Sequence, residues 1–186
     1  SSDLYYTMFG IDCLNALDSK PNISLGDYVK SYESLSSLDF IHICSYIQLV
    51  SSLAKFNINP KDFENQNSKD FFQKKIECYR CLDGGYNVVK YSEIGSLYGC
   101  FLAVSAYEEL NLLIPDKDGI LQCLNRLKTK DGGFTNEFGL PDGITTATSA
   151  ALILLNRFNQ QIPAQSVDWL LNMLHLSGGF LAFPNA

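Results

Sequence analysis

Cysteines and histidines are the side chains of this 186-residue chain whose spacing could support metal or thiol chemistry. Cys78 and Cys81 form a Cys-x-x-Cys motif, which is typical of zinc sites and of redox centres. No second Cys or His pair lies at finger-like spacing, however, and no βαβ pattern surrounds the motif. The two histidines are His175 and His42. His42 lies beside Cys44 on an apolar stretch, where a lone histidine is more often a core residue than a metal ligand. These residues therefore predict no metal site.

Composition excludes several further classes. The net charge of -6 and the pI near 4.8 argue against a general nucleic-acid binder, because contacts to phosphate need clustered Lys and Arg. No window holds the roughly 18 uninterrupted apolar residues that a membrane span requires. The six cysteines do not have the spacing of a secreted disulfide framework. We therefore expect a reduced, cytoplasmic setting, no nucleic-acid partner and no membrane span.

A repeat decides the architecture. The strings Asp83-Gly84-Gly85-Tyr86, Asp131-Gly132-Gly133-Phe134 and Ser177-Gly178-Gly179-Phe180 follow one another at spacings of 48 and 46 residues. Periods of this length are typical of stacked units that cannot bury their apolar faces alone. We expect the aspartate to accept backbone N–H groups, the glycines to take positive φ, and the aromatic residue to fill the gap between neighbouring units.

Each turn separates two kinds of helix. Amphipathic stretches precede the second and third turns, and the stretches 96–107 and 145–155 that follow the first and second are apolar almost all round. Asp118 is predicted to be the N-cap of an amphipathic helix that begins at Gly119 or Ile120. In the first half, Leu4–Leu17 and Leu38–Ala54 are predicted as apolar helices, and Asp27–Leu35 and Lys61–Arg80 as more polar ones. The fold class is therefore all-α, in a single domain over residues 1–186, with about four inner and four outer helices.

The Asp-Gly-Gly-aromatic turns between helical hairpins resemble the repeats of protein prenyltransferase β subunits and of squalene and terpene cyclases. Segments 84–100, 131–151 and 169–184 carry the resemblance, which covers residues 76–186 well and the first half only by its helix pattern. It implies an α/α toroid around an aromatic-lined cavity that holds an isoprenoid, since aromatic faces bury apolar chains and stabilise carbocations. The candidate ligand-binding residues are Tyr5, Tyr6, Phe9, Tyr98, Phe101 and Asp142. Other aromatic residues on the predicted inner helices are Phe40 and Tyr46.

The catalytic signatures of these families are not matched. Their zinc is held by an Asp-x-Cys pair and a later His, whereas Asp142 is followed by Ile144, and Tyr6 takes the place of the histidine in an Asp-Leu-Tyr-His-Thr-like stretch. The cyclase string Asp-x-Asp-Asp is approached only by Asp116-Lys117-Asp118-Gly119, which lacks the last aspartate. Catalytic residues are therefore not assigned, and no cofactor is evident, although the resemblance would allow zinc.

Two functions remain open. The chain could be a prenyltransferase-like protein that binds a prenyl diphosphate and acts as a transferase if it is active. Alternatively, it could be a toroid-derived scaffold or protein-binding module whose core is filled by its own side chains. Because the family toroid has more inner helices than this chain provides, we expect either a fragment of a longer chain, a homo-oligomer, or a second subunit that completes the ring.

Overall fold

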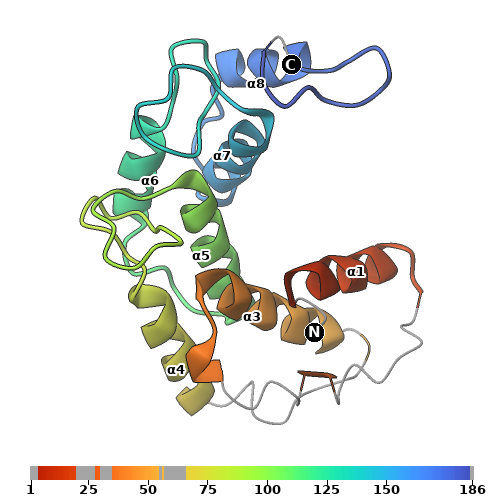
Figure 1. The fold of residues 1–186 in the computed structure, drawn as a ribbon, viewed down its shortest axis with the longest axis vertical. Coiled ribbons are helices and arrows are strands. Elements are labelled where there is room, and N and C mark those ends of the chain that lie inside the picture. Colours follow the sequence, from red (N-terminus) through yellow and green to blue (C-terminus); the bar gives the residue numbers. More distant parts are fainter. Residues whose placement is uncertain (1–3, 20–27, 30–34, 55, 57–65, 185–186) are drawn as a thin grey trace. The chain divides into compact units, whose positions relative to one another are not determined.

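A computed structural model describes the chain except residues 1–3, 20–27, 30–34, 55, 57–65 and 185–186 (Figure 1). Throughout these described residues the regular elements are helices, and the only β-type pairs are isolated bridges. This confirms the predicted all-α class. The chain divides into two compact units, residues 1–78 with 105–113 and residues 79–104 with 114–186, and each is described by itself.

The first unit is built on α1 (Leu4–Ala16), α3 (Phe40–Ala54) and α4 (Gln66–Glu77), with α1 and α4 each packed against α3 (Figure 1). The helices predicted at Leu4–Leu17 and Leu38–Ala54 are confirmed to within two residues. That predicted at Lys61–Arg80 is shorter in the structure. Most of the helix predicted at Asp27–Leu35 lies outside the described residues, and a short 3-10 helix, η1, spans Leu35–Ser37.

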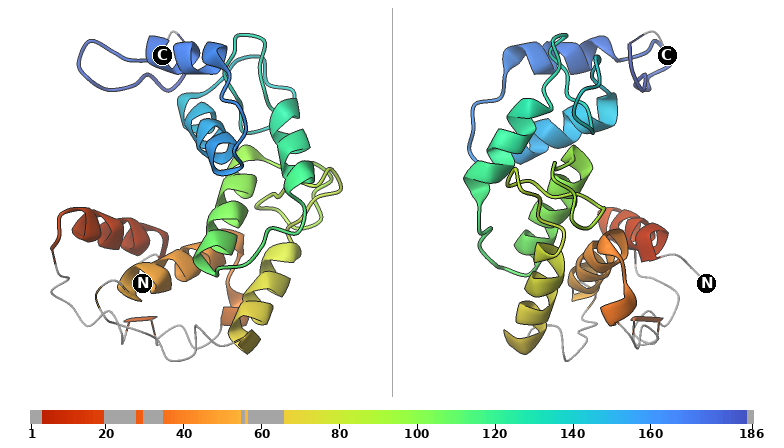
Figure 2. Two further views of the ribbon diagram at one scale, coloured as in Figure 1. Left: turned by 180° about the vertical axis from the view of Figure 1, so that it is seen from behind. Right: turned by 60° about the vertical axis from the view of Figure 1, so that its left-hand side comes forward.

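The second unit alternates the two helix types that the repeat predicted. Its apolar helices are α5 (Leu97–Glu109), whose last residues belong to the first unit, and α7 (Thr145–Arg157). Its amphipathic helices are α6 (Lys117–Arg126) and α8 (Ala164–Asn172), and α8 packs against α7 (Figure 2). Asp116 is the N-cap of α6, and its Oδ1 accepts the Gly119 N–H at 2.8 Å. The prediction that Asp118 is the cap is wrong, because the helix begins earlier and Asp118 lies in its first turn.

The three Gly-Gly turns share one hydrogen-bond pattern. In the second, the Gly132 N–H donates to the Thr129 carbonyl at 3.2 Å and the Thr129 N–H to the Gly133 carbonyl at 3.0 Å. A single antiparallel bridge closes each turn, as between Lys128 and Phe134. The turns are therefore tight four-residue reversals between helices, and they do not extend into strands.

The two glycines of a turn differ in backbone conformation, although both are closely packed in the first two turns. Gly84, Gly132 and Gly178 have positive φ, which confirms the prediction for the first glycine, whereas the second glycine of each turn does not, so the prediction is wrong there. The second glycine is required for close packing: a Cβ on Gly85 would lie 2.6 Å from the Cys123 Sγ, and one on Gly133 would lie 2.8 Å from the Trp169 ring. The sequence alone could not predict this packing of the second glycine, since the contacting residues come from the next amphipathic helix.

The aromatic residue of the turn fills a gap in two turns of the three. Tyr86 and Phe134 are buried, as predicted, whereas Phe180 is 54% exposed. The prediction therefore fails for the third turn, where more than half of Phe180 is exposed. No helix among the described residues is long and apolar enough to cross a bilayer.

Candidate binding pocket

A pocket of about 380 Å³ lies in the second unit, where the first turns of α5 and α7 meet. Leu97 and Tyr98 line it from the start of α5, and Ile144 precedes α7 on the opposite wall. The remaining lining residues are Asn136, Thr146, Ala147 and Ala150. The wall is mainly apolar, and the small side chains of α7 leave the space open. Its volume is within the usual range for small-ligand sites, about 300–1,000 Å³.

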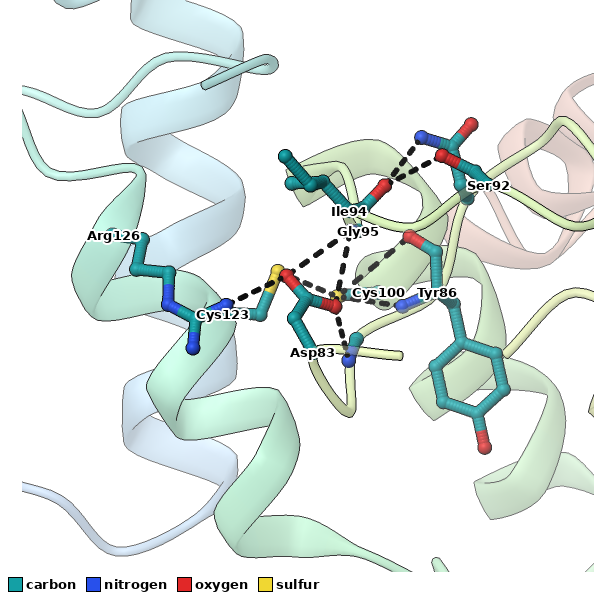
Figure 3. Close-up of polar contacts among 10 residues, drawn as sticks. Asp83, Tyr86, Ser92, Ile94, Gly95, Cys100, Cys123 and Arg126 are labelled. Atoms are coloured by element: carbon teal, nitrogen blue, oxygen red, sulfur yellow. Dashed lines mark hydrogen bonds and ion pairs between the residues drawn. The ribbon is translucent and has the colours of Figure 1, made fainter. Parts of the chain in front are cut away.

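A carboxylate in each of the first two turns fixes the helix start that borders the pocket. Asp83 accepts the N–H groups of Gly85 at 3.0 Å and Gly95 at 3.1 Å, and Arg126 of α6 lies 3.4 Å from its Oδ2 (Figure 3). Because only 5% of the Asp83 side chain is exposed, these partners take the place of water. Gly95 stands two residues before α5, so the turn and the helix start are held together.

Asp131, the carboxylate of the second turn, fixes the start of α7 in the same way. It accepts the N–H groups of Gly133 at 3.1 Å and Gly143 at 3.2 Å, the Trp169 indole N–H at 2.8 Å, and the Thr129 hydroxyl. Burial alone would raise the pKa of Asp131, but these hydrogen bonds outweigh it and hold the pKa below the ordinary value of 3.8. The carboxylate is therefore ionised at neutral pH and joins the turn, the loop before α7 and helix α8.

The loops after the second and third turns also cap the apolar helix of the preceding repeat. The backbone carbonyl of Asn136 accepts the Leu97 N–H at 3.2 Å, and its side-chain Oδ1 accepts the Tyr98 N–H at 2.9 Å. One repeat later the carbonyl of Ala182 accepts the Thr145 N–H at 2.9 Å, but alanine has no side chain to reach a second donor. Asn136 is thus both a pocket residue and a helix cap.

Exchanging these two cap residues should change stability in opposite directions. Asn136→Ala removes the side-chain acceptor of α5, and we expect a loss of about 1 kcal/mol in the free energy of unfolding. Ala182→Asn places an amide where it can accept from the start of α7, and we expect a gain of up to about 1 kcal/mol. Urea denaturation followed by Trp169 fluorescence measures both. A loss in both variants would contradict the equivalence of the two loops.

The structure brings together few of the predicted ligand-binding residues. Tyr98 lines the pocket, whereas Asp142 is exposed and the Phe101 ring lies 5.4 Å beneath the Arg157 guanidinium. Tyr5, Tyr6 and Phe9 belong to the first unit, where Tyr5 contacts the other two rings edge to face. Phe40 and Tyr46 are buried in α3.

Sequence reasoning missed most of the pocket wall. Asn136, Ile144 and Thr146 lie in segment 131–151, which carries the resemblance, but none of them was named as a ligand-binding residue. The useful signal was the run of small residues in α7, Ala147 and Ala150, which indicated close helix approach but not an open space.

The thiols near the first turn are not arranged as nucleophiles. A hydrogen bond with Cys100, followed by burial, raises the pKa of Cys123, and burial raises the pKa of Cys81 to about 11. The Cys100 and Cys123 Sγ atoms lie 3.9 Å apart, and both side chains are buried. Because the thiolate is the reactive form, these cysteines act as small apolar residues at neutral pH.

The described residues do not fit a zinc centre. No group of three or more His, Cys, Asp or Glu side chains among them could hold a metal ion. His42 lies 2.8 Å from Asp39, and the His175 Nδ1 lies 2.8 Å from the Ser177 Oγ, so each imidazole has a local partner. No chemical step through zinc is therefore derived for this chain.

No protein-family model and no curated protein sequence matches the chain.

Proposed function

We propose that the chain binds an isoprenoid, as a prenyl diphosphate, with the apolar tail in the pocket between α5 and α7. The observation that supports this most is the pocket itself, because its wall of aliphatic and small side chains with one aromatic ring suits a branched hydrocarbon. A methyl-rich chain would gain roughly 0.8 kcal/mol for each CH₂ that it buries.

The charged end of such a ligand would lie at the helix starts. The first residues of α5 and α7 both border the pocket. Asn136 and Ala182 already accept the Leu97, Tyr98 and Thr145 N–H groups, so it is the aligned peptide dipoles of the two helices that favour negative charge there. Asn136 and Thr146 add polar groups to the same rim. The pocket therefore offers an apolar interior and a rim suited to an anion.

The proposal extends to architecture and activity. The repeated hairpins support an α/α toroid of the prenyltransferase and terpene cyclase type. If the chain is an enzyme, we expect it to be a prenyltransferase-type transferase. No nucleophile or metal ligand set is assigned among the described residues, so binding is the central claim. The alternative is a scaffold that binds another protein, and the exposed apolar residues of the third turn favour it.

Thermal unfolding in the presence of ligands tests the binding claim. With farnesyl or geranylgeranyl diphosphate at tenfold excess over Kd, we expect about 1.4 kcal/mol of stabilisation, which corresponds to a rise of about 3–5 °C in Tm. Pyrophosphate alone should give a smaller rise, because it cannot use the apolar wall. The absence of a shift with every isoprenoid tested would overturn the proposal.

A matched pair of variants places the ligand. Ala150→Phe fills the pocket and should abolish the shift, whereas Ile153→Phe changes an exposed position of the same helix and should leave it unchanged. Equal shifts in both variants would mean that the isoprenoid binds elsewhere.

A further inference from the structure

The pocket between α5 and α7 is small enough to limit the length of a prenyl chain. All the residues that line it belong to the second unit. A water-sized group occupies about 30 Å³ of a liquid, so a volume of about 380 Å³ holds roughly a dozen groups of the size of a methyl or methylene. A prenyl chain has five carbons in each isoprene unit. Two units therefore fit within the pocket, and a third exceeds it.

Backbone hydrogen bonds hold the walls of the pocket in place. The Ile144 N–H donates to the Phe134 carbonyl at 2.8 Å on one wall. On the opposite wall the Leu97 N–H donates to the Asn136 carbonyl, and the Leu97 side chain is fully buried. Walls fixed in this way separate only if these hydrogen bonds break, which has a cost of its own. Carbons beyond the second isoprene unit would therefore extend into solvent.

Two polar groups of the pocket can bind the head of such a ligand. The Asn136 Oδ1 accepts the Tyr98 N–H at 2.9 Å, which fixes the orientation of the amide and leaves the two N–H groups of its Nδ2. Among the described residues we find no partner for this Nδ2 or for the Thr146 hydroxyl. Both residues line the pocket, so they can donate to the oxygen that joins a prenyl chain to its diphosphate.

We propose that the pocket selects a prenyl diphosphate of two isoprene units, geranyl diphosphate, and that Asn136 and Thr146 bind its first oxygen. This selection rests on the isoprenoid binding proposed above and adds to it the length of the prenyl chain. No charged side chain lines the pocket, so binding depends mainly on the carbons that leave water. Affinity therefore rises with chain length up to two isoprene units and then stays level.

Isothermal titration calorimetry with dimethylallyl, geranyl, farnesyl and geranylgeranyl diphosphate tests this selection. We expect Kd to fall about tenfold or more from dimethylallyl to geranyl diphosphate, because a second isoprene unit is buried. From geranyl to the two longer diphosphates Kd should change by less than about threefold, because the added carbons stay in water. A Kd that keeps falling up to geranylgeranyl diphosphate would overturn the length limit and leave isoprenoid binding intact. A failure of all four to bind would overturn both.

Ile144→Ala and Ile153→Ala form a matched pair that tests the wall. Both remove the same carbons, but Ile144 lines the pocket, whereas Ile153 is an exposed residue of α7 outside it. Ile144→Ala makes room for a third isoprene unit, and we expect this variant to bind farnesyl diphosphate about threefold or more tightly than geranyl diphosphate. Ile153→Ala should keep the wild-type order. The same length dependence in both variants would contradict the assignment of the wall.

Asn136→Asp tests the binding of the head. The aspartate keeps an oxygen that can accept the Tyr98 N–H but has no N–H group to donate to a ligand, so the unfolding midpoint without ligand should not fall. We expect Kd for geranyl diphosphate to rise about tenfold or more. Geraniol has the same chain without the charge, and its Kd should rise as well, which separates the lost donors from charge repulsion. An unchanged Kd for geraniol would overturn the role of Asn136.

Discussion

Asp131→Ala should lower the free energy of unfolding of the second unit by about 1–3 kcal/mol. The substitution removes the acceptor of three donors: the Gly133 N–H, the Gly143 N–H and the Trp169 indole N–H. Among the described residues, Asp131 is the acceptor found for each of them. Each buried donor left without a partner costs about 1–3 kcal/mol. Gly133, Gly143 and Trp169 are buried whereas Asp131 is exposed, so water reaches the place of the carboxylate but satisfies the three donors only in part.

Trp169 is the single tryptophan of the chain and reports on this contact directly. Urea denaturation followed by its fluorescence gives the unfolding free energy of wild type and variant. Asp142→Asn is the control, because Asp142 is an exposed carboxylate of the same loop, and its substitution should change stability by less than about 0.5 kcal/mol. Equal effects of Asp131→Ala and Asp142→Asn would show that the carboxylate does not hold the turn.

The same carboxylate should make stability depend on pH. Because the folded-state pKa of Asp131 is lower than its ordinary value of 3.8, the folded state binds fewer protons than the unfolded state. Its contribution is present in full above that ordinary value and is lost as the pH falls through the lower folded pKa. The difference in unfolding free energy between wild type and Asp131→Asn should therefore narrow as the pH falls below the ordinary value of 3.8.

Gly99→Ala should be strongly destabilising although it replaces glycine by the best helix former. A Cβ at Gly99 of α5 would lie 2.3 Å from the Tyr86 carbonyl oxygen and 2.7 Å from its carbonyl carbon. Both atoms are backbone of the first turn, which Asp83 fixes, so the helix must move away from the turn. We expect a loss of about 2–3 kcal/mol, the range found when a packed core is overfilled.

Gly10→Ala is the matched control in α1. A Cβ at Gly10 has nothing within 4 Å, so only the intrinsic preference for alanine acts there. It should stabilise the first unit by about 0.5–1 kcal/mol. Amide hydrogen exchange separates the two units and should show lower protection around the first turn in Gly99→Ala and higher protection in α1 in Gly10→Ala. A gain in stability in both variants would mean that Gly99 of α5 is not closely packed against the first turn.

The sequence by itself determined the helical class and the repeated turns of this protein. Helical spacing of apolar residues located α1, α3 and the helices of the second unit, and the Gly-Gly pairs located the turns, where glycine permits the positive φ of Gly84 and Gly132. These features depend on residues close together in the chain, where local pattern and backbone preference act. The hydrogen bonds that the Gly85 and Gly133 N–H groups donate to the aspartate of their turn were predicted for the same reason, since donor and acceptor are two residues apart.

Only the tertiary structure decided what surrounds each turn. Cys123 and Trp169 come from helices more than thirty residues away and explain why the second glycine cannot carry a side chain. The pocket depends in the same way on Asn136, which the chain brings to the start of α5 from the following repeat. The exposure of Phe180 against the burial of Phe134 likewise reflects distant neighbours, since the two residues occupy the same place in turns that share the Gly-Gly-Phe string and the same backbone hydrogen bonds. Burial is set by what packs against a residue from far along the chain, and a local pattern carries no record of that partner.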